Sequence, residues 1–205
     1  MNPKFMKKPI QLFFIGCVAA AMAGCSSAPS RFYTLNATAK GNGGSAVPCA
    51  VLVGPVFVPA SVERPQFVVT TATNRVELEE FNRWAAPLGE SIARVISTDL
   101  GVMLGTSRAA SAPVPNFGPA YQVTIRIERF ESALGGGKMA GEALVDAVWT
   151  IRNPSATSVD TGHTVAREPA RGSDFEALAA AHSRALARVS SDIAVAIRMA
   201  ETEKK

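Results

Sequence analysis

The sequence predicts an α+β fold: a single two-layer domain in which two main helices lie on one face of an antiparallel or mixed β-sheet. Alternating apolar and polar residues at 121–131 and 143–151 predict half-buried strands. Apolar residues at three- and four-residue steps in 87–104 and 175–200 predict amphipathic helices. The order of strands, helix, strands, helix indicates connections by hairpins rather than by crossovers.

The N-terminus is typical of a bacterial lipoprotein signal peptide. Three lysines precede an apolar run at 10–23, which is too short to span a bilayer stably. Residues 22–25 (Met-Ala-Gly-Cys) then match a lipobox, in which small residues precede the cysteine. We therefore expect residues 1–24 to be removed, and diacylglycerol and an N-acyl chain to be attached to Cys25. The alternative is an ordinary secretory signal with an incidental cysteine.

Removal of the signal changes the composition. It leaves 181 residues, which suit one domain, and lowers the net charge from +4 to +1. A nearly neutral domain gives no support to nucleic-acid binding.

Ser26 and Ser27 resemble the sorting residues of lipoproteins sent to the outer membrane. Cys49 stays without a second thiol to pair with, and its apolar neighbours predict a buried, inert cysteine.

The expected domain spans 31–205 and follows a lipidated tether at 25–30. A short strand is expected at 31–35, followed by a flexible loop at 36–48 rich in Gly, Asn and Ser. Residues 50–58 are apolar at both the odd- and the even-numbered positions, which predicts a strand covered on both faces or lying centrally in the sheet. Pro55 within them indicates a bulge or the strand's end. Residues 67–71 and 76–79 predict a hairpin that turns at Thr73-Asn74.

The second half contains the two helices and a meander. The first helix is expected at 87–104, with Pro87 in its first turn, and a loop at 105–119 follows. A Gly-Gly-Gly-Lys turn at 135–138 joins the two long strands, and 161–167 predicts a weaker third strand. Ser173 and Glu176 match a capping box that would begin the last helix.

No catalytic, cofactor-binding or metal-binding residues are predicted, so we expect a protein that is not an enzyme. His182 lies on the apolar stripe of the last helix, which favours a packed residue over a ligand. His163 has no Cys or His at metal spacing, and the chain lacks a G-x-S-x-G nucleophile motif. The glycine turn at 135–138 lacks the spacing of a phosphate-binding loop.

Two segments around the expected hairpin carry residues favoured at interfaces. Arg64 precedes the hairpin, and Arg83 and Trp84 follow it. Trp and Arg are common interface anchors, which leaves a partner surface open. Composition alone favours the structural alternative, in which Trp84 caps the core and Arg83 pairs with a local acid.

In these segments the sequence resembles the PqiC (YmbA) family, auxiliary lipoproteins of envelope transport systems built around MCE proteins. The shared pieces fall within 31–104, and the sequence departs from the family pattern at Ala86, where the family usually has an acid. The matching residues are Phe32-Tyr33-Thr34-Leu35, Val53-Gly54-Pro55-Val56, Val58-Pro59, Arg64-Pro65-Gln66, Asn82-Arg83-Trp84-Ala85, Pro87-Leu88 and Ile92-Ala93-Arg94-Val95-Ile96.

The resemblance implies a lipoprotein anchored in the outer membrane and facing the periplasm. It implies work with an MCE tunnel protein and its inner-membrane partner in moving lipids between membranes, which maintains envelope integrity, and assembly into a homo-oligomeric ring. The candidate partner or subunit interface is Arg64, Pro65, Gln66, Asn82, Arg83 and Trp84. Two alternatives stay open: an assembly lipoprotein of another envelope machine, for lipopolysaccharide insertion or secretion, and a lipid-anchored hydrolase.

Overall fold

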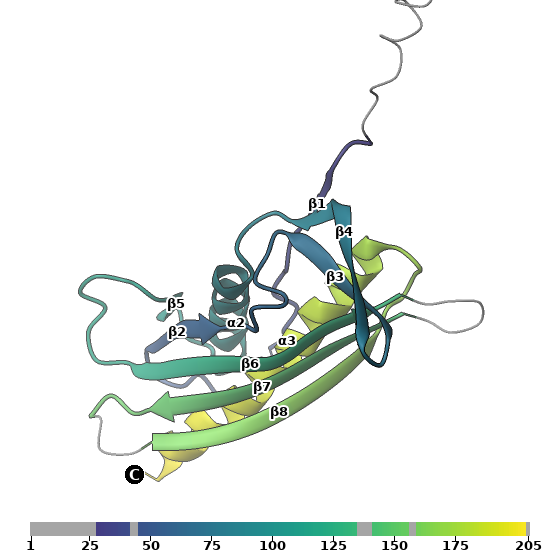
Figure 1. The fold of residues 1–205 in the computed structure, drawn as a ribbon. Coiled ribbons are helices and arrows are strands. Elements are labelled where there is room, and N and C mark those ends of the chain that lie inside the picture. The colour runs from purple at the N-terminus through teal and green to yellow at the C-terminus, as the bar shows by residue number, and fades with distance from the viewer. Residues whose placement is uncertain (1–27, 42–44, 135–140, 156–158, 204–205) are drawn as a thin grey trace, which may run out of the picture. The chain divides into compact units, whose positions relative to one another are not determined.

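The structure is a computed structural model that describes residues 28–41, 45–134, 141–155 and 159–203. Within these residues, one mixed sheet holds eight strands and two helices pack against it (Figure 1). This confirms the predicted α+β fold. The elements, in chain order, are β1 (Arg31–Tyr33), β2 (Val51–Phe57), β3 (Gln66–Ala72), β4 (Arg75–Trp84), α2 (Leu88–Leu104), β5 (Ala109–Ser111), β6 (Tyr121–Ala133), β7 (Glu142–Arg152), β8 (Val159–Pro169) and α3 (Phe175–Thr202).

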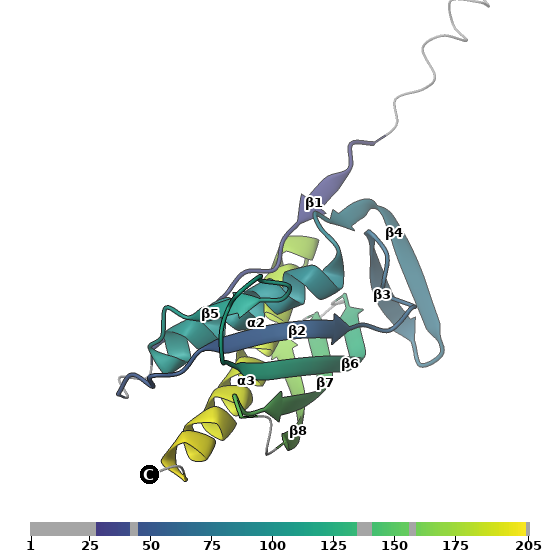
Figure 2. The same cartoon turned by 90° about the vertical axis from the view of Figure 1, so that its left-hand side faces the viewer.

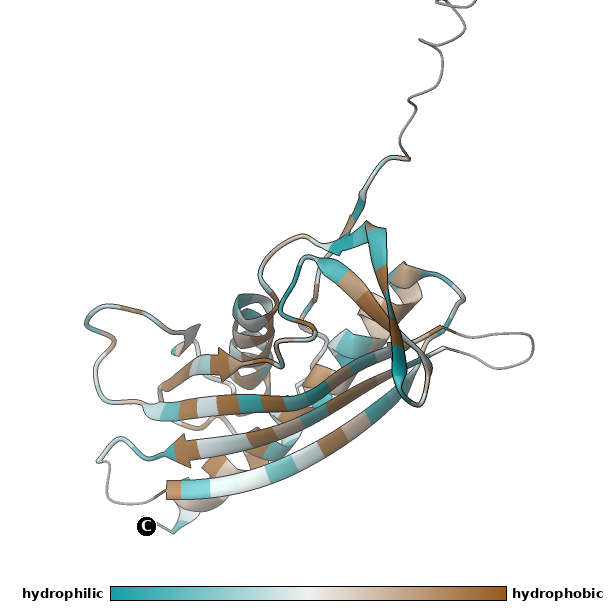
Figure 3. Ribbon diagram, in the orientation of Figure 1, coloured by the Kyte–Doolittle hydropathy of each residue, from teal (hydrophilic) through white to brown (hydrophobic). Residues whose placement is uncertain are grey.

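Strand β6 organises the sheet. One of its edges pairs antiparallel with β7 along the whole strand, and β7 pairs in the same way with β8, as the predicted meander requires. Its other edge pairs with β2 in the first half and meets β3 near the end, at Ser132. Figure 3 shows hydrophobic residues, in brown, alternating with white and teal ones along β6, which matches the periodicity seen in the sequence. The long strands therefore form the floor on which the helices pack.

The expectation of hairpins alone is wrong. Strand β2 runs parallel to both β5 and β6, and β1 runs parallel to β4, so the sheet contains crossover connections (Figure 2). Hydrophobic alternation is the same for parallel and antiparallel neighbours, which is why the sequence pattern did not reveal the direction. The predicted bulge at Pro55 is confirmed, since the pairing of β2 with β6 shifts register between Val53 and Val56.

Both helices begin close to the predicted positions, with different caps. Pro87 is the N-cap of α2 and not a residue of its first turn, and Gly105 ends this helix with a left-handed φ of 67°. In α3 the cap is Asp174, whose Oδ1 accepts a hydrogen bond from the Ala177 N–H at 2.8 Å. The capping box predicted from Ser173 is therefore wrong, because an acceptor one residue later satisfies the first turn.

The core lies between the sheet and the two helices. Helix α2 packs against β2, β5 and α3, and α3 covers β7 and β8 (Figure 1). Leu35, just after β1, is fully buried in this core, and Cys49 is buried as predicted. This packing fixes three segments at one end of α2: the bulge of β2, the loop before β3, and the turn from β4 into the helix.

Candidate functional site

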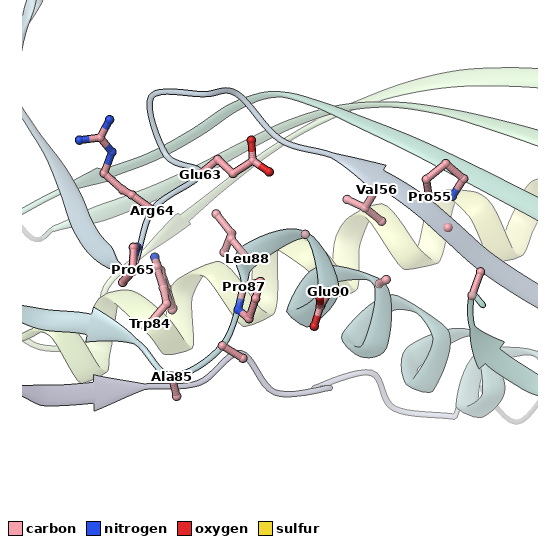
Figure 4. Close-up of a pocket in the computed structure, with 15 residues that line it drawn as sticks. Pro55, Val56, Glu63, Arg64, Pro65, Trp84, Ala85, Pro87, Leu88 and Glu90 are labelled. Carbon is pink, nitrogen blue, oxygen red and sulfur yellow. The ribbon is translucent and has the colours of Figure 1, made fainter. Parts of the chain in front are cut away.

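A pocket of about 640 Å³ lies at the N-terminal end of α2 (Figure 4). Three chain segments line it: the bulge of β2, the loop before β3, and the turn from β4 into α2. Ala112 contributes one further side chain. Most of the lining side chains are apolar and small. They are Gly54, Pro55, Val56, Glu63, Arg64, Pro65, Trp84, Ala85, Ala86, Pro87, Leu88, Gly89, Glu90, Ala93 and Ala112.

Backbone contacts hold the three walls together. The Trp84 N–H donates to the Pro65 carbonyl oxygen at 2.6 Å, which joins the turn to the loop before β3. Gly89, in the first turn of α2, approaches β2 so closely that a Cβ atom there would lie 3.1 Å from the Val56 carbonyl oxygen. The pocket is thus preformed by hydrogen bonds and close packing of the backbone.

Trp84 is a core residue that also lines the pocket. Its side chain is only 7% exposed, and its ring stacks on Phe67 with a centroid distance of 4.0 Å. The position of Trp84 in this chain therefore matches the structural alternative, in which the indole caps the core. Arg83 likewise has a local partner: its Nε donates to the Glu80 carbonyl oxygen at 2.7 Å, and its Nη2 lies 3.8 Å from a Glu80 carboxylate oxygen.

The remaining candidate residues gather beside the pocket. Gln66 pairs with Arg83 across β3 and β4, so the two ends of this hairpin meet beside the pocket. Asn82 accepts a hydrogen bond from the Tyr33 hydroxyl at 3.0 Å and donates to Glu79 at 3.1 Å, which ties β1 to β4. Arg64, Pro65 and Trp84 line the pocket itself, whereas Gln66, Asn82 and Arg83 support its wall.

The sequence reasoning missed two acids and one wall of this pocket. Glu63 and Glu90 are exposed on its rim, and neither they nor Arg64 form a salt bridge with another residue that the structure describes. The wall that was not predicted is the bulge at Gly54 and Pro55. Its signal was visible, because Val53-Gly54-Pro55-Val56 belongs to the motif shared with the family.

A serine–histidine pair occurs elsewhere and bears on the hydrolase alternative. Ser132 Oγ lies 2.8 Å from His182 Nε2, at the spacing of a nucleophile and its base. Both residues are buried, and His182 Nδ1 meets no hydrogen-bond partner in the described part of the chain. Burial lowers the pKa of His182 to about 3, which makes it a weak base. A substrate has no access to this pair, and the packed histidine predicted from the sequence is what the structure shows.

The expected lipid-attachment and sorting residues, Cys25, Ser26 and Ser27, lie outside the described residues. In the part of the chain that is described, no helix is long and apolar enough to cross a membrane.

Comparisons with known proteins place these observations in a family. The family described as "ABC-type transport auxiliary lipoprotein component" matches residues 33–194, which is most of the chain. None of the curated proteins matches this sequence.

Two solved structures share the fold. A crystal structure of a protein from Xanthomonas campestris, assigned to a family of unknown function, is 17% identical and superposes with a TM-score of 0.69 over 86% of this chain and 100% of its own. A second crystal structure, of an uncharacterised protein, is 15% identical with a TM-score of 0.64 over 83% of this chain and 99% of its own. At these identities the likeness shows the fold alone.

The family match confirms the resemblance to PqiC (YmbA) that the motifs at 31–104 indicated. Its description implies a non-catalytic part in transport and attachment to a membrane by lipid. The chain belongs to the family of ABC-type transport auxiliary lipoprotein components.

Proposed function

We propose that this lipoprotein is the outer-membrane-anchored, periplasmic adaptor of an MCE-type system that moves lipids between the two membranes and maintains envelope integrity. The observation that carries the proposal is the family match over residues 33–194. The adaptor would work with an MCE tunnel protein and its inner-membrane partner, and it would assemble as a homo-oligomeric ring.

The pocket supports a binding role over a catalytic one. Its lining consists mainly of prolines, alanines and buried aromatic or aliphatic side chains, with charged residues at the rim only. Such a surface can hold a protein segment but offers no nucleophile beside a base. The pocket also unites pieces of the sequence shared with the family, Arg64-Pro65 and Trp84 among them, which is expected if those pieces serve a common partner.

Attachment to the membrane is assigned to Cys25, released as the new N-terminus when residues 1–24 are removed. Residues 26–30 then form the tether to β1, and Ser26 and Ser27 direct the protein to the outer membrane. Three acyl chains bury many methylene groups at about 0.8 kcal/mol each, so the attachment would be effectively permanent.

Affinity purification from detergent-solubilised envelopes tests the function. We expect an MCE protein to co-purify with the wild-type lipoprotein. Recovery of an outer-membrane barrel of the lipopolysaccharide-insertion or secretion machinery, without an MCE protein, would replace this proposal by that of an assembly lipoprotein.

Fractionation tests the anchor separately. A Cys25→Ala variant, fitted with a signal that the ordinary signal peptidase cleaves, should leave the membrane fraction and appear in the periplasm. If this variant still sediments with the outer membrane after a high-salt wash, Cys25 is not the residue that holds the protein there.

A further inference from the structure

We propose that the pocket at the N-terminal end of α2 is the docking site for an apolar side chain of a protein partner, flanked in that partner by lysine or arginine. The inference rests on the proposed function, because the partner is taken to be the MCE protein, and it names the chemistry that this site recognises. It is carried by the combination of an apolar floor, rigid walls and two rim carboxylates.

The floor is apolar and fixed. Leu88 and Trp84 are 4% and 7% exposed, so most of each side chain is already packed in the core and only an edge is offered to the pocket. A volume of about 640 Å³ exceeds what one large apolar side chain needs. It falls within the roughly 300–1,000 Å³ of preformed binding sites. An inserted side chain would bury apolar surface on both partners.

The walls are rigid. Pro55, Pro65 and Pro87 stand in the three wall segments, and the alanines between them have no side-chain rotamers to lose. The tight turn before β3 is closed by hydrogen bonds from the Glu63 N–H to the Pro59 carbonyl oxygen at 3.1 Å and from the Arg64 N–H to the Val62 carbonyl oxygen at 2.8 Å. A preorganised site of this kind binds with little ordering cost.

The rim selects the charge of the occupant. Glu63, on the loop before β3, and Glu90, in the first turn of α2, both line the pocket (Figure 4). Both carboxylates are exposed, and the salt bridges of the described residues leave them without a cation. With Arg64 as the single base among the lining residues, the rim carries a net charge of −1.

This charge pattern favours a protein segment over a lipid. A partner that places a lysine or arginine beside the inserted side chain satisfies Glu63 or Glu90, whereas an anionic headgroup is repelled and a bare acyl chain leaves both acids unpaired. Glu90 alone has a local explanation, because an acid in the first turn stabilises the helix dipole. Glu63 lies on a loop, so a helix dipole does not explain an acid at this position.

Site-specific photocrosslinking identifies the occupant. Ala86 is exposed and lines the pocket, so a photoreactive residue there, in the full-length lipoprotein, should crosslink to the MCE protein in intact cells. A crosslink to lipid, or to a second copy of this chain in place of the MCE protein, would overturn the proposal.

Charge reversal tests the rim. The double variant Glu63→Lys with Glu90→Lys should weaken binding of the purified MCE protein to the detergent-solubilised lipoprotein by about tenfold or more, and the wild-type affinity should fall as salt is added. The matched control is Glu128→Lys with Glu176→Lys. It changes the net charge by the same amount. Glu128 lies on strand β6 and Glu176 in the first turn of α3, and neither residue lines the pocket.

Filling the pocket tests the apolar part. Ala85→Trp should reduce the binding, whereas Ala180→Trp, at an exposed alanine of α3, should leave it unchanged. Thermal unfolding of each variant verifies that it is folded. Equal recovery of the MCE protein with the wild type and both pocket variants would refute this site while leaving the proposed function intact. No recovery with the wild type would refute the function itself, and the inference with it.

Discussion

Trp84 stacks on Phe67 with the two rings 4.0 Å apart, and this stack joins the end of β4 to the beginning of β3 within the core. Trp84 also makes edge contacts with Phe130 and His182, at 6.0 and 6.1 Å. Since the same indole forms part of the pocket floor, the shape of the candidate site depends on the packing of the aromatic cluster behind it.

Trp84→Ala should therefore lower the free energy of unfolding by about 3–5 kcal/mol, as large aromatic truncations in cores do. Trp84→Phe, which keeps a ring against Phe67, should cost less than half as much. Urea denaturation followed by circular dichroism measures both. Arg64→Ala is the control, since this exposed residue should change stability by about 0.5 kcal/mol or less. A loss below about 1 kcal/mol for Trp84→Ala would show that the indole acts at a surface instead.

His182 should make the protein less stable in acid. Burial lowers its pKa from 6.5 to about 3, so between these values the unfolded chain binds a proton that the folded chain does not. Stability then falls as pH drops below 6.5, with a slope approaching about 1.4 kcal/mol per pH unit for this group alone. Replacement by Phe, which stacks on Phe130 without titrating, should remove this part of the slope.

The measurement is the difference in unfolding free energy between wild type and His182→Phe from pH 7 to pH 4. Asp99, whose pKa is raised by burial, contributes to both proteins and cancels in the difference. A difference that does not change with pH would mean that His182 is protonated in the folded protein too.

Gly162 is required by Trp149. A Cβ atom at residue 162 of β8 would lie 2.0 Å from the Trp149 ring, which the pairing of β7 with β8 places directly opposite. Gly162→Ala should therefore displace this ring, break the Trp149 Nε1–Thr164 hydrogen bond of 3.1 Å and cost about 1–3 kcal/mol or more. Gly41→Ala is the matched control, because a Cβ atom there meets nothing within 4 Å. Equal melting temperatures for the two variants would contradict this account.

Much of the fold could be predicted because periodicity reports burial. The helix at 87–104, the hairpin around Thr73-Asn74 and the meander of β6, β7 and β8 all followed from local pattern and turn residues. The parallel pairing of β2 with β6 did not, because it joins segments more than sixty residues apart and no local pattern encodes it.

The candidate site was only partly predictable. The family motif pointed to Arg64, Pro65 and Trp84, which the structure does bring to one pocket. It gave no means of deciding that Trp84 faces inward, since an apolar residue at a strand end fits a core and an interface equally well. Glu63 and Glu90 were not recognised, because isolated surface acids have no signature until the fold sets them around the same apolar floor.

The segment after β1 is held by a buried acid. Asp99 of α2 is fully buried, and its Oδ1 accepts hydrogen bonds from the Thr38 and Ala39 N–H groups at 3.0 and 2.9 Å. Ser190 Oγ of α3 donates to its Oδ2 at 3.3 Å. Burial raises the pKa of Asp99, and these three donors oppose that effect. Part of the loop expected at 36–48 is thus fastened to both helices.

Asp99→Ala should free this segment. It leaves two backbone N–H groups without their acceptor, at a cost of about 1–3 kcal/mol, whereas Asp99→Asn keeps an acceptor oxygen and should cost much less. Limited trypsin digestion provides a local readout, because Lys40 is exposed and lies next to the fastened residues. Cleavage after Lys40 requires the segment to detach, so it should become faster in Asp99→Ala by a larger factor than in Asp99→Asn. Equal cleavage rates in the wild type and both variants would show that the Asp99 contacts do not hold the segment. A faster rate confined to Asp99→Ala would show that the acceptor oxygen, rather than the charge, fastens the chain that leads from the lipid anchor into the domain.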